Sequence, residues 1–324
     1  MATGFNVSGL TAYTDQLSQD LIVRSVLKPA SVDMLTIKAG ITATSFAFNI
    51  LGSTISAKPY ACGFASGQTD GNTTIFTQQV MPVETLMVKE VQCIETLRSY
   101  WISSAMSASA YANETPVFEK AITDLKVAQI NAFIETTIWQ GNLGTGGVIE
   151  GLQSILSVAN GAVNGTGSAT KFASASTAYA GFWELFDTLS AANPAVIQND
   201  DLVLYCSLAT YSKLVQSLLN KGVSLLQPYA NINNVGGSPV NSFTWPGTQV
   251  TIFGTPGISD DIASPAVPSV YLYPKKYLFY GVGVDNDQAK FKYYYNPAND
   301  DLHFLAAFRM GVTGISNQGV STTA

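Results

Sequence analysis

The sequence predicts a mixed α+β fold, in which a long helix and a long β-ribbon accompany a smaller α/β unit. Three observations lead to this prediction. Residues 116–139 follow one uninterrupted helical pattern, residues 41–50 and 73–80 alternate as strands do, and residues 177–222 follow the order helix, strand, helix. A chain of 324 residues buries about three-quarters of its unfolded surface on folding, so it needs neither disulfides nor a metal for stability.

Charged residues are scarce in this chain. Lys and Arg number 16 and Asp and Glu 22, so 12% of the residues are charged, about half of what is usual for a soluble domain. The net charge of −6 argues against a basic nucleic-acid-binding surface, and 47% hydrophobic residues argue against disorder. The pattern predicts no signal peptide and no membrane span. Because the cores of protein interfaces are depleted in charge, the composition indicates an assembly protein.

The N-terminal third predicts an exposed β-ribbon. Its expected elements are a helix at 17–26 and strands at 41–50, 73–80 and 84–94. Alternation in the first strand places Phe46, Phe48 and Ile50 on one face, and a polar loop separates this strand from the next. An isolated two-stranded ribbon is marginally stable in water, so we expect a partner surface to cover it.

Residues 116–139 predict the strongest element, a helix about 36 Å long. Thr115 is a suitable N-cap, Pro116 suits the first helical position, and Gly141 suits the position after the last turn. Apolar residues at spacings of three and four predict the buried stripe, at Phe118, Ile122, Leu125, Ala128 and Ala132. A helix of about twice the usual length is more often a structural spine than a catalytic element.

The second half of the chain alternates helices with strands and then ends in strands. A helix at 177–189, a strand at 202–206 and a helix capped by Ser207 predict a small α/β layer. Between Gly222 and Pro274 the chain has no Lys or Arg and only two acids, which suggests an interface. The other strands are expected at 249–253, 270–273, 277–284, 290–295 and 302–312.

No pattern of catalytic or ligand-binding residues stands out. His303 is the single histidine and alternates with apolar residues in an expected strand, which favours a structural role over acid–base catalysis. Cys62, Cys93 and Cys206 fit neither a disulfide framework nor a zinc site. The glycine-rich loop after the long helix lacks the lysine of a phosphate-binding loop. We therefore expect no catalytic, cofactor or metal site, and no enzyme activity.

Two short motifs carry further information. A glycine-rich turn follows the long helix at residues 138–152, and a strand at Phe304–Val312 has Arg309 shortly before a Gly-Val pair. With the order of the elements, these motifs resemble the major capsid proteins of tailed bacteriophages, which have the Hong Kong 97-type capsid fold. The parts that this resemblance implies are an N-terminal arm (1–40), an extended β loop (41–82), a peripheral domain (83–175) with a spine helix (116–139), an axial domain (176–270) and a return to the peripheral domain (271–324).

The resemblance implies a structural shell protein that self-assembles into an icosahedral head enclosing phage double-stranded DNA. The implied partners are copies of the chain in hexamers and pentamers, a portal, weakly contacted DNA and, because few residues precede the β loop, a separate scaffolding protein. No membrane is involved, and the implied location is the virion, after assembly in the bacterial host cytoplasm. The candidate assembly contacts are Phe46, Phe48, Ile50, Lys58, Phe76 and Trp245.

Three alternatives remain open at the level of the sequence. An encapsulin-like nanocompartment would have the same fold but would enclose a cargo enzyme. A secreted adhesin or carbohydrate-binding protein fits the abundance of Ser, Thr and Asn, and predicts a signal peptide and mostly β structure. A hydrolase is the third alternative, and the single histidine argues against it.

Overall fold

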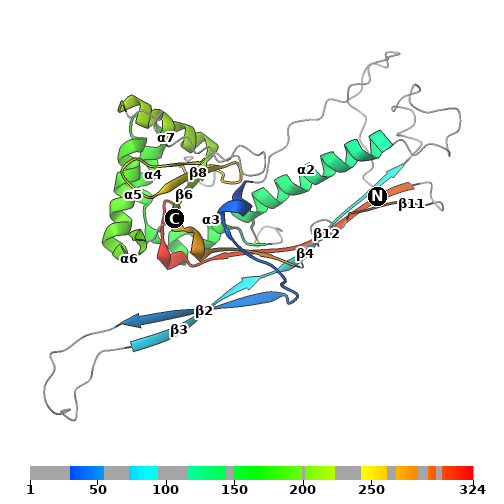
Figure 1. Cartoon of the computed structure of the whole chain (residues 1–324), viewed down its shortest axis with the longest axis horizontal. Helices are drawn as coiled ribbons and strands as arrows, with labels where there is room; N and C mark the ends of the chain where they lie inside the picture. Colours follow the sequence, from blue (N-terminus) through cyan, green and yellow to red (C-terminus); the bar gives the residue numbers. More distant parts are fainter. Residues whose placement is uncertain are drawn as a thin grey trace, which may run out of the picture.

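The protein is elongated: a long helix lies along a long sheet, a helix-rich lobe stands at one end, and a two-stranded ribbon projects away (Figure 1). The structure is a computed structural model that describes residues 30–54, 73–93, 116–142, 149–198, 201–222, 242–260, 268–283, 291–296 and 301–323. The expected helix at 17–26, Thr115, Lys58 and most of the glycine-rich turn lie outside these described residues.

A five-stranded sheet forms the long axis of the molecule and is built around β12. This strand pairs antiparallel with β4, β10 and β11, and β1 adds to β10 in parallel. The bounds are β1 Thr36–Lys38, β4 Glu84–Cys93, β10 Leu278–Val282, β11 Phe291–Asn296 and β12 Asp301–Gly314. Four of these strands match expected strands closely, whereas the three-residue β1 has no counterpart among them.

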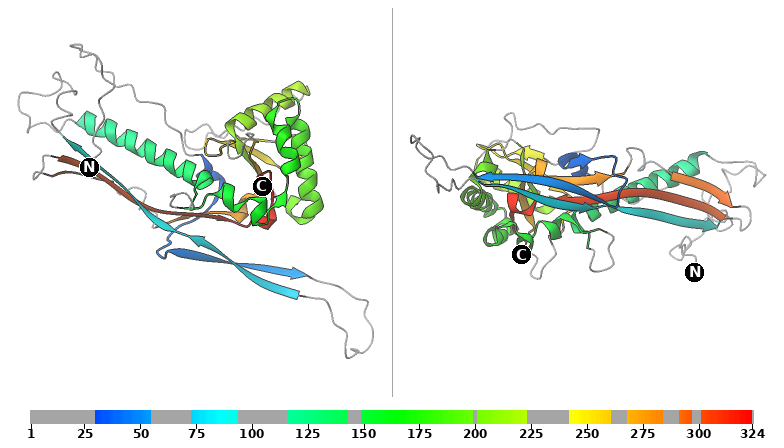
Figure 2. Two further views of the ribbon diagram at one scale, coloured as in Figure 1. Left: turned by 180° about the vertical axis from the view of Figure 1, so that it is seen from behind. Right: turned by 90° about the horizontal axis from the view of Figure 1, so that it is seen from below.

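Helix α2, Pro116–Gln140, runs alongside β4 and β12 (Figure 2). Its bounds confirm the predicted helix, but its buried stripe differs from the predicted one. The stripe that packs in the core consists of Ile130, Ile134 and Ile138, spaced four residues apart. Leu125, Ala128 and Ala132 of the predicted stripe are only half-buried. Because apolar residues occupy both faces of this helix, periodicity alone could not select the face that packs on the sheet.

The helix-rich lobe contains a six-stranded mixed sheet in the order β5-β13-β9-β6-β8-β7, with helices α5 and α7 packed on it. The bounds are β5 Val163–Asn164, α5 Ala178–Ala192, β6 Leu202–Ser207, α7 Leu208–Asn220, β7 Ser242–Thr244, β8 Thr251–Thr255, β9 Val270–Pro274 and β13 Val320–Ser321. The predicted N-cap of α7 is confirmed, since the Ser207 hydroxyl accepts a hydrogen bond from the Thr210 amide at 3.1 Å.

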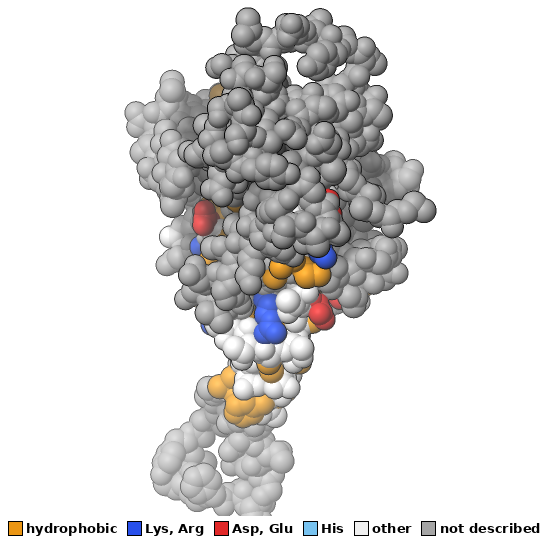
Figure 3. Space-filling model, turned by 90° about the vertical axis from the view of Figure 1, so that its right-hand side faces the viewer, with side chains coloured by type: hydrophobic (Ala, Val, Ile, Leu, Met, Phe, Trp, Pro, Cys, Tyr) orange, Lys and Arg blue, Asp and Glu red, His pale blue; other side chains and the backbone are white. Residues whose placement is uncertain are grey.

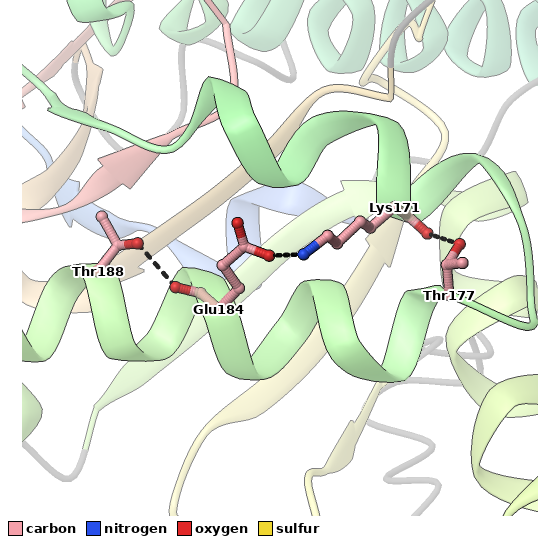
Figure 4. A network of polar contacts seen from close by, with 4 residues as sticks. All are labelled: Lys171, Thr177, Glu184 and Thr188. Atoms are coloured by element: carbon pink, nitrogen blue, oxygen red, sulfur yellow. Dashed lines mark hydrogen bonds and ion pairs between the residues drawn. The ribbon is translucent and has the colours of Figure 1, made fainter.

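Short helices complete the chain, and side-chain contacts join two of them to α5 (Figure 4). Lys171 forms an ion pair with Glu184 of α5, and the Thr177 hydroxyl donates to the Lys171 carbonyl at 2.6 Å. Both charged side chains are largely exposed, so we expect this pair to contribute at most about 1 kcal/mol. The bounds of the short helices are η1 Ser31–Met34, α3 Leu152–Ile155, η3 Val158–Asn160, α4 Thr166–Ala169, η4 Thr170–Ala173, α6 Pro194–Ile197, η5 Lys275–Tyr277 and η7 Ser316–Gln318.

Candidate functional site

The ribbon consists of β2, Ser45–Thr54, and β3, Thr73–Pro82, which pair antiparallel along their whole length. Both strands confirm the strand pair expected from the alternation of the sequence. Among the described residues β2 pairs with no strand except β3, so the ribbon projects from the body as a separate two-stranded sheet (Figure 1). We call its end next to the five-stranded sheet the ribbon root.

A small hydrophobic core fixes the ribbon root to its own chain. Ile41, Met81 and Val83 are buried together with Phe279 of β10. The ring of Phe48 stacks on the ring of Phe279, with centroids 4.1 Å apart. Because burying one side chain of this size contributes about 1.5–3 kcal/mol, these contacts are sufficient to hold the root in place.

Two glycines let the root approach the five-stranded sheet closely. A Cβ atom on Gly311 of β12 would lie 2.3 Å from the carbonyl oxygen of Pro82, and one on Gly281 would lie 2.3 Å from Cε of Met81. Only residues without a side chain fit at these distances. Gly311 belongs to the closing motif identified in the sequence, so this motif glycine is required for packing at the root.

Arg309, of the same motif, links three segments at the root. Its Nε donates to the Thr85 hydroxyl of β4 at 2.8 Å, and its Nη1 donates to the Thr42 carbonyl before β2 at 2.6 Å. The planar guanidinium holds its donors in a rigid fork, which suits simultaneous contacts to separate segments. The side chain therefore fixes the angle at which the ribbon leaves the sheet.

The register of β2 and β3 sorts their side chains onto two faces, because directly opposed residues of antiparallel strands point to the same side. We call one the root face, and it comprises Phe46, Phe48, Ile50, Ile75, Thr77, Gln79 and Met81. We call the other the free face, and it comprises Ala47, Asn49, Leu51, Phe76, Gln78 and Val80. Besides Phe48 and Met81, the root face contributes Gln79, whose Nε2 donates to the Thr313 hydroxyl of β12 at 3.3 Å.

The free face carries large apolar side chains that nothing in the described chain covers. Phe76 is 76% exposed, Leu51 63% and Val80 48%. Hydrophobic side chains gather along the projecting ribbon in the space-filling view (Figure 3). The described ribbon segments 41–54 and 73–83 contain no charged residue at all. Contiguous exposed apolar surface of this kind marks an interaction site.

Four of the six candidate assembly contacts lie on the described ribbon. Phe46 is 37% exposed, Phe48 and Ile50 are half-buried, and Phe76 is the most exposed large hydrophobic residue of the described chain. Their contact with another subunit stays a prediction, as does that of Lys58, which lies outside the described residues.

Leu51 is the residue that sequence reasoning missed. It is paired directly with Phe76 across the ribbon. The alternation that identified the first strand drew attention to Phe46, Phe48 and Ile50, which lie on the opposite face. The Leu51–Phe76 pair could have been found only from the strand register, which the sequence alone does not give.

The structure places Trp245 in the core of its own chain, which corrects its assignment as an assembly contact. Its side chain is 1% exposed, and its ring stacks on Phe182 of α5 with centroids 4.1 Å apart. The charge-poor stretch around it requires the same correction. Its strands β7, β8 and β9 are almost entirely buried, so burial in the lobe accounts for the absence of charge there.

The described residues also bear on chemistry. They contain no group of three or more His, Cys, Asp or Glu side chains that could hold a metal ion. Cys206 is fully buried in β6, and this burial, with a smaller effect of Asp260, raises the pKa of its thiol, which disfavours the reactive thiolate. His303 lies on β12 between β4 and β11. None of the described helices is both long and apolar enough to cross a membrane.

No protein-family model and no curated protein matches the sequence. Solved structures do match. The capsid of Myoviridae phage XM1 aligns with a TM-score of 0.60 at 15% identity, covering 98% of this chain and 97% of that one. The capsid of Ralstonia phage GP4 aligns with a TM-score of 0.55 at 10% identity, covering 100% and 98%. This chain has the Hong Kong 97-type capsid fold. A third capsid, from an empty GTA particle, aligns with a TM-score of 0.53 at 13% identity, covering 98% and 97%.

The capsid fold gives the first sequence motif a structural reason as well. The glycine-rich turn that follows α2 brings Gly141 and Gly151 together, and the Gly151 amide donates to the Gly141 carbonyl at 2.7 Å. A Cβ on Gly151 would lie 2.4 Å from the carbonyl oxygen of Trp139. Both motifs of the predicted capsid fold are therefore places where two backbone segments approach too closely for a side chain.

Proposed function

We propose that this chain is the major capsid protein of a tailed bacteriophage, which self-assembles into an icosahedral head around double-stranded DNA. The observation that carries the proposal is the alignment with phage capsid chains over nearly the full length of both partners. Because one fold can serve several functions, the exposed apolar ribbon is a second, independent support. An uncovered ribbon is marginal in water and becomes stable when another surface covers it.

The proposed function is mechanical and requires no catalysis. The ribbon lies across a neighbouring copy of the chain and buries there the apolar side chains that its own subunit leaves in water. Each Phe or Leu that moves from water into such a contact contributes about 1.5–3 kcal/mol. The low charge of the chain limits repulsion between the many copies of a shell.

The finer parts of the proposal follow from the same assembly. The copies form hexamers and pentamers, guided by a separate scaffolding protein, closed on a portal and weakly contacted by the packaged DNA. Assembly takes place in the bacterial cytoplasm, and the product is the virion head. The proposed parts are the N-terminal arm (1–40), extended β loop (41–82), peripheral domain (83–175), axial domain (176–270) and return to the peripheral domain (271–324).

The alternatives considered from the sequence are not favoured. An adhesin predicts mostly β structure, in contrast to α2 and the helix-rich lobe. A nanocompartment shell has the same fold, but the capsids that align here are those of phages and a GTA particle. A hydrolase would need an activated nucleophile, and the fully buried Cys206 does not provide one.

Electron microscopy and sedimentation of the purified chain test the function itself. We expect closed particles, or capsomers that close into particles as the concentration rises. A chain that remains a monodisperse monomer throughout contradicts the shell protein.

A ribbon deletion tests the role of the ribbon. Asn49 and Gln78 are directly opposed, so a two-residue Asn-Gly turn in place of residues 50–77 closes a shortened hairpin and leaves the root intact. We expect a subunit that folds but forms no closed shell. Normal particles from this variant would refute the role of the ribbon in assembly.

A further inference from the structure

The two faces of the ribbon have different relationships to their own subunit. Three residues of the root face contact the five-stranded sheet: Phe48 stacks on Phe279, Gln79 bonds to Thr313, and Met81 is fully buried. No comparable contact reaches the free face from the described chain. The root face is therefore the side that the ribbon turns toward its own body, and the free face is the side turned away.

The composition of the free face suits burial against another protein. Leu51 and Phe76 form a directly opposed apolar pair, and Ala47 with Val80 forms a second pair nearer the root. Between these pairs, the Gln78 amide donates to the Asn49 side chain at 3.3 Å. The polar pair thus satisfies part of its hydrogen bonding internally, which lowers the cost of removing it from water.

We propose that the free face, centred on Leu51 and Phe76, is the surface by which the ribbon docks on a second copy of this chain. The proposal rests on the proposed shell function and specifies which face makes the contact. A second copy is the occupant that fits, because a shell is built from repeated contacts between copies. A strip without any charge also suits a chain with only 12% charged residues.

Root-face residues provide the matched control. Ile75 is the neighbour of Phe76 in the chain, is 58% exposed, and points to the root face opposite Gly52. Substitution of Ile75 changes the apolar character of the ribbon as much as substitution of Leu51 does, but on the other side. A comparison of the two faces therefore separates docking through the free face from a general need for an apolar ribbon.

The first experiment compares Leu51→Ser/Phe76→Ser with Ile75→Ser in the full chain. Central apolar anchors dominate interface affinity, so we expect the free-face variant to lower the fraction of chain in closed particles at least about tenfold. The Ile75→Ser variant should assemble within about twofold of the unchanged chain, because side chains outside the interface core contribute little. Thermal unfolding of the unassembled subunits should be the same for all three, because these side chains are exposed.

The outcomes distinguish the two proposals. If Ile75→Ser abolishes assembly and the free-face variant does not, the assignment of the face is overturned and the ribbon's role stands. If both variants and the ribbon deletion all assemble normally, the ribbon's role in assembly is overturned as well. Equal loss in both variants overturns the assignment of the face.

Crosslinking gives a second readout that does not depend on the stability of variants. A benzophenone amino acid is placed at position 76 in one protein and at position 75 in another, and assembled particles are irradiated. We expect crosslinked dimers of the chain from position 76 and few from position 75. Equal dimer yields, dimers mainly from position 75, or a crosslink within one chain from position 76 would each overturn docking through the free face.

Discussion

The Ser31 hydroxyl donates a hydrogen bond of 2.6 Å to the carboxylate of Glu135, although the two residues lie 104 positions apart in the chain. Glu135 is fully buried on α2, and its carboxylate also accepts the amides of Ala30 and Ser31 at 3.1 Å each and the hydroxyl of Thr255. One side chain thus joins the segment before β1, the long helix and the end of β8. It holds the five-stranded sheet and the helix-rich lobe to the same point of α2.

Substitution Glu135→Ala tests this cluster. It leaves several buried donors without an acceptor, and each unsatisfied buried group costs about 1–3 kcal/mol. We expect the free energy of unfolding of the unassembled subunit to fall by at least about 3 kcal/mol, measured by urea denaturation. Glu184→Gln, which removes the exposed ion pair with Lys171, is the control and should cost at most about 1 kcal/mol. Similar small losses for both variants would contradict a structural role for Glu135.

Substitution Gly311→Ala tests the close approach of the ribbon root. The added methyl group would overlap the Pro82 carbonyl, so β12 or the root must shift. Such overpacking destabilises proteins by about 1–3 kcal/mol, and we expect a loss of this size in thermal or urea unfolding. Gly167→Ala is the control, because nothing lies within 4 Å of its added Cβ in α4. This control should be neutral or slightly stabilising, and an unchanged Gly311→Ala subunit would refute the packing argument.

Substitution Trp245→Ala measures the contribution of a core residue that the sequence suggested as a surface contact. Removal of a fully buried aromatic side chain costs about 3–5 kcal/mol, and we expect this loss in the unassembled subunit. Phe76→Ala, at the most exposed large hydrophobic residue, should change subunit stability by less than about 0.5 kcal/mol. A Trp245→Ala subunit of unchanged stability that fails only in assembly would restore Trp245 as an assembly contact.

The subunit is expected to lose stability in alkaline solution through its buried tyrosines. Burial raises the pKa of Tyr271 from its ordinary value near 10 to about 12. The folded state therefore retains a proton that the unfolded state releases, so the stabilisation is complete below pH 10 and is lost as the pH rises toward 12. The shift corresponds to about 3 kcal/mol in all.

Urea denaturation at pH 8, 10 and 11, with tyrosine absorbance as a parallel probe, measures this loss. Burial also raises the pKa values of Tyr205 and Tyr273, so Tyr271→Phe should remove only part of the pH dependence. A urea midpoint that does not fall between pH 8 and pH 11 would contradict the prediction.

Local patterns predicted the regular elements of this fold well, because their signals lie within one segment. The helix predicted at 116–139 is α2, and the Ser207 cap was identified correctly because capping depends on residues three positions apart. Predictions failed where distant segments decide the outcome. The buried face of α2 and the burial of Trp245 depend on partners far away in the chain. The short strands β1 and β13 exist only through pairing with β10, β5 and β9.

The candidate site was predicted in position but not in orientation. Alternation in residues 41–50 identified a ribbon and its apolar character, and the lack of charge suggested assembly. The face that remains free depends on the register between β2 and β3 and on the packing of Phe48 and Met81 at the root. A shift of one residue in that register would exchange the two faces, and no local pattern encodes it.

The central position of β12 has a consequence for synthesis of the protein. This strand joins β4, β10 and β11, and it also carries Arg309 and Gly311, to which the ribbon root is attached. During translation, the five-stranded sheet therefore stays incomplete until residues 301–314 have left the ribosome. A polypeptide that stops earlier lacks the strand on which the ribbon is mounted. Completion of translation thus precedes entry into a shell, and prematurely terminated chains are kept out of it.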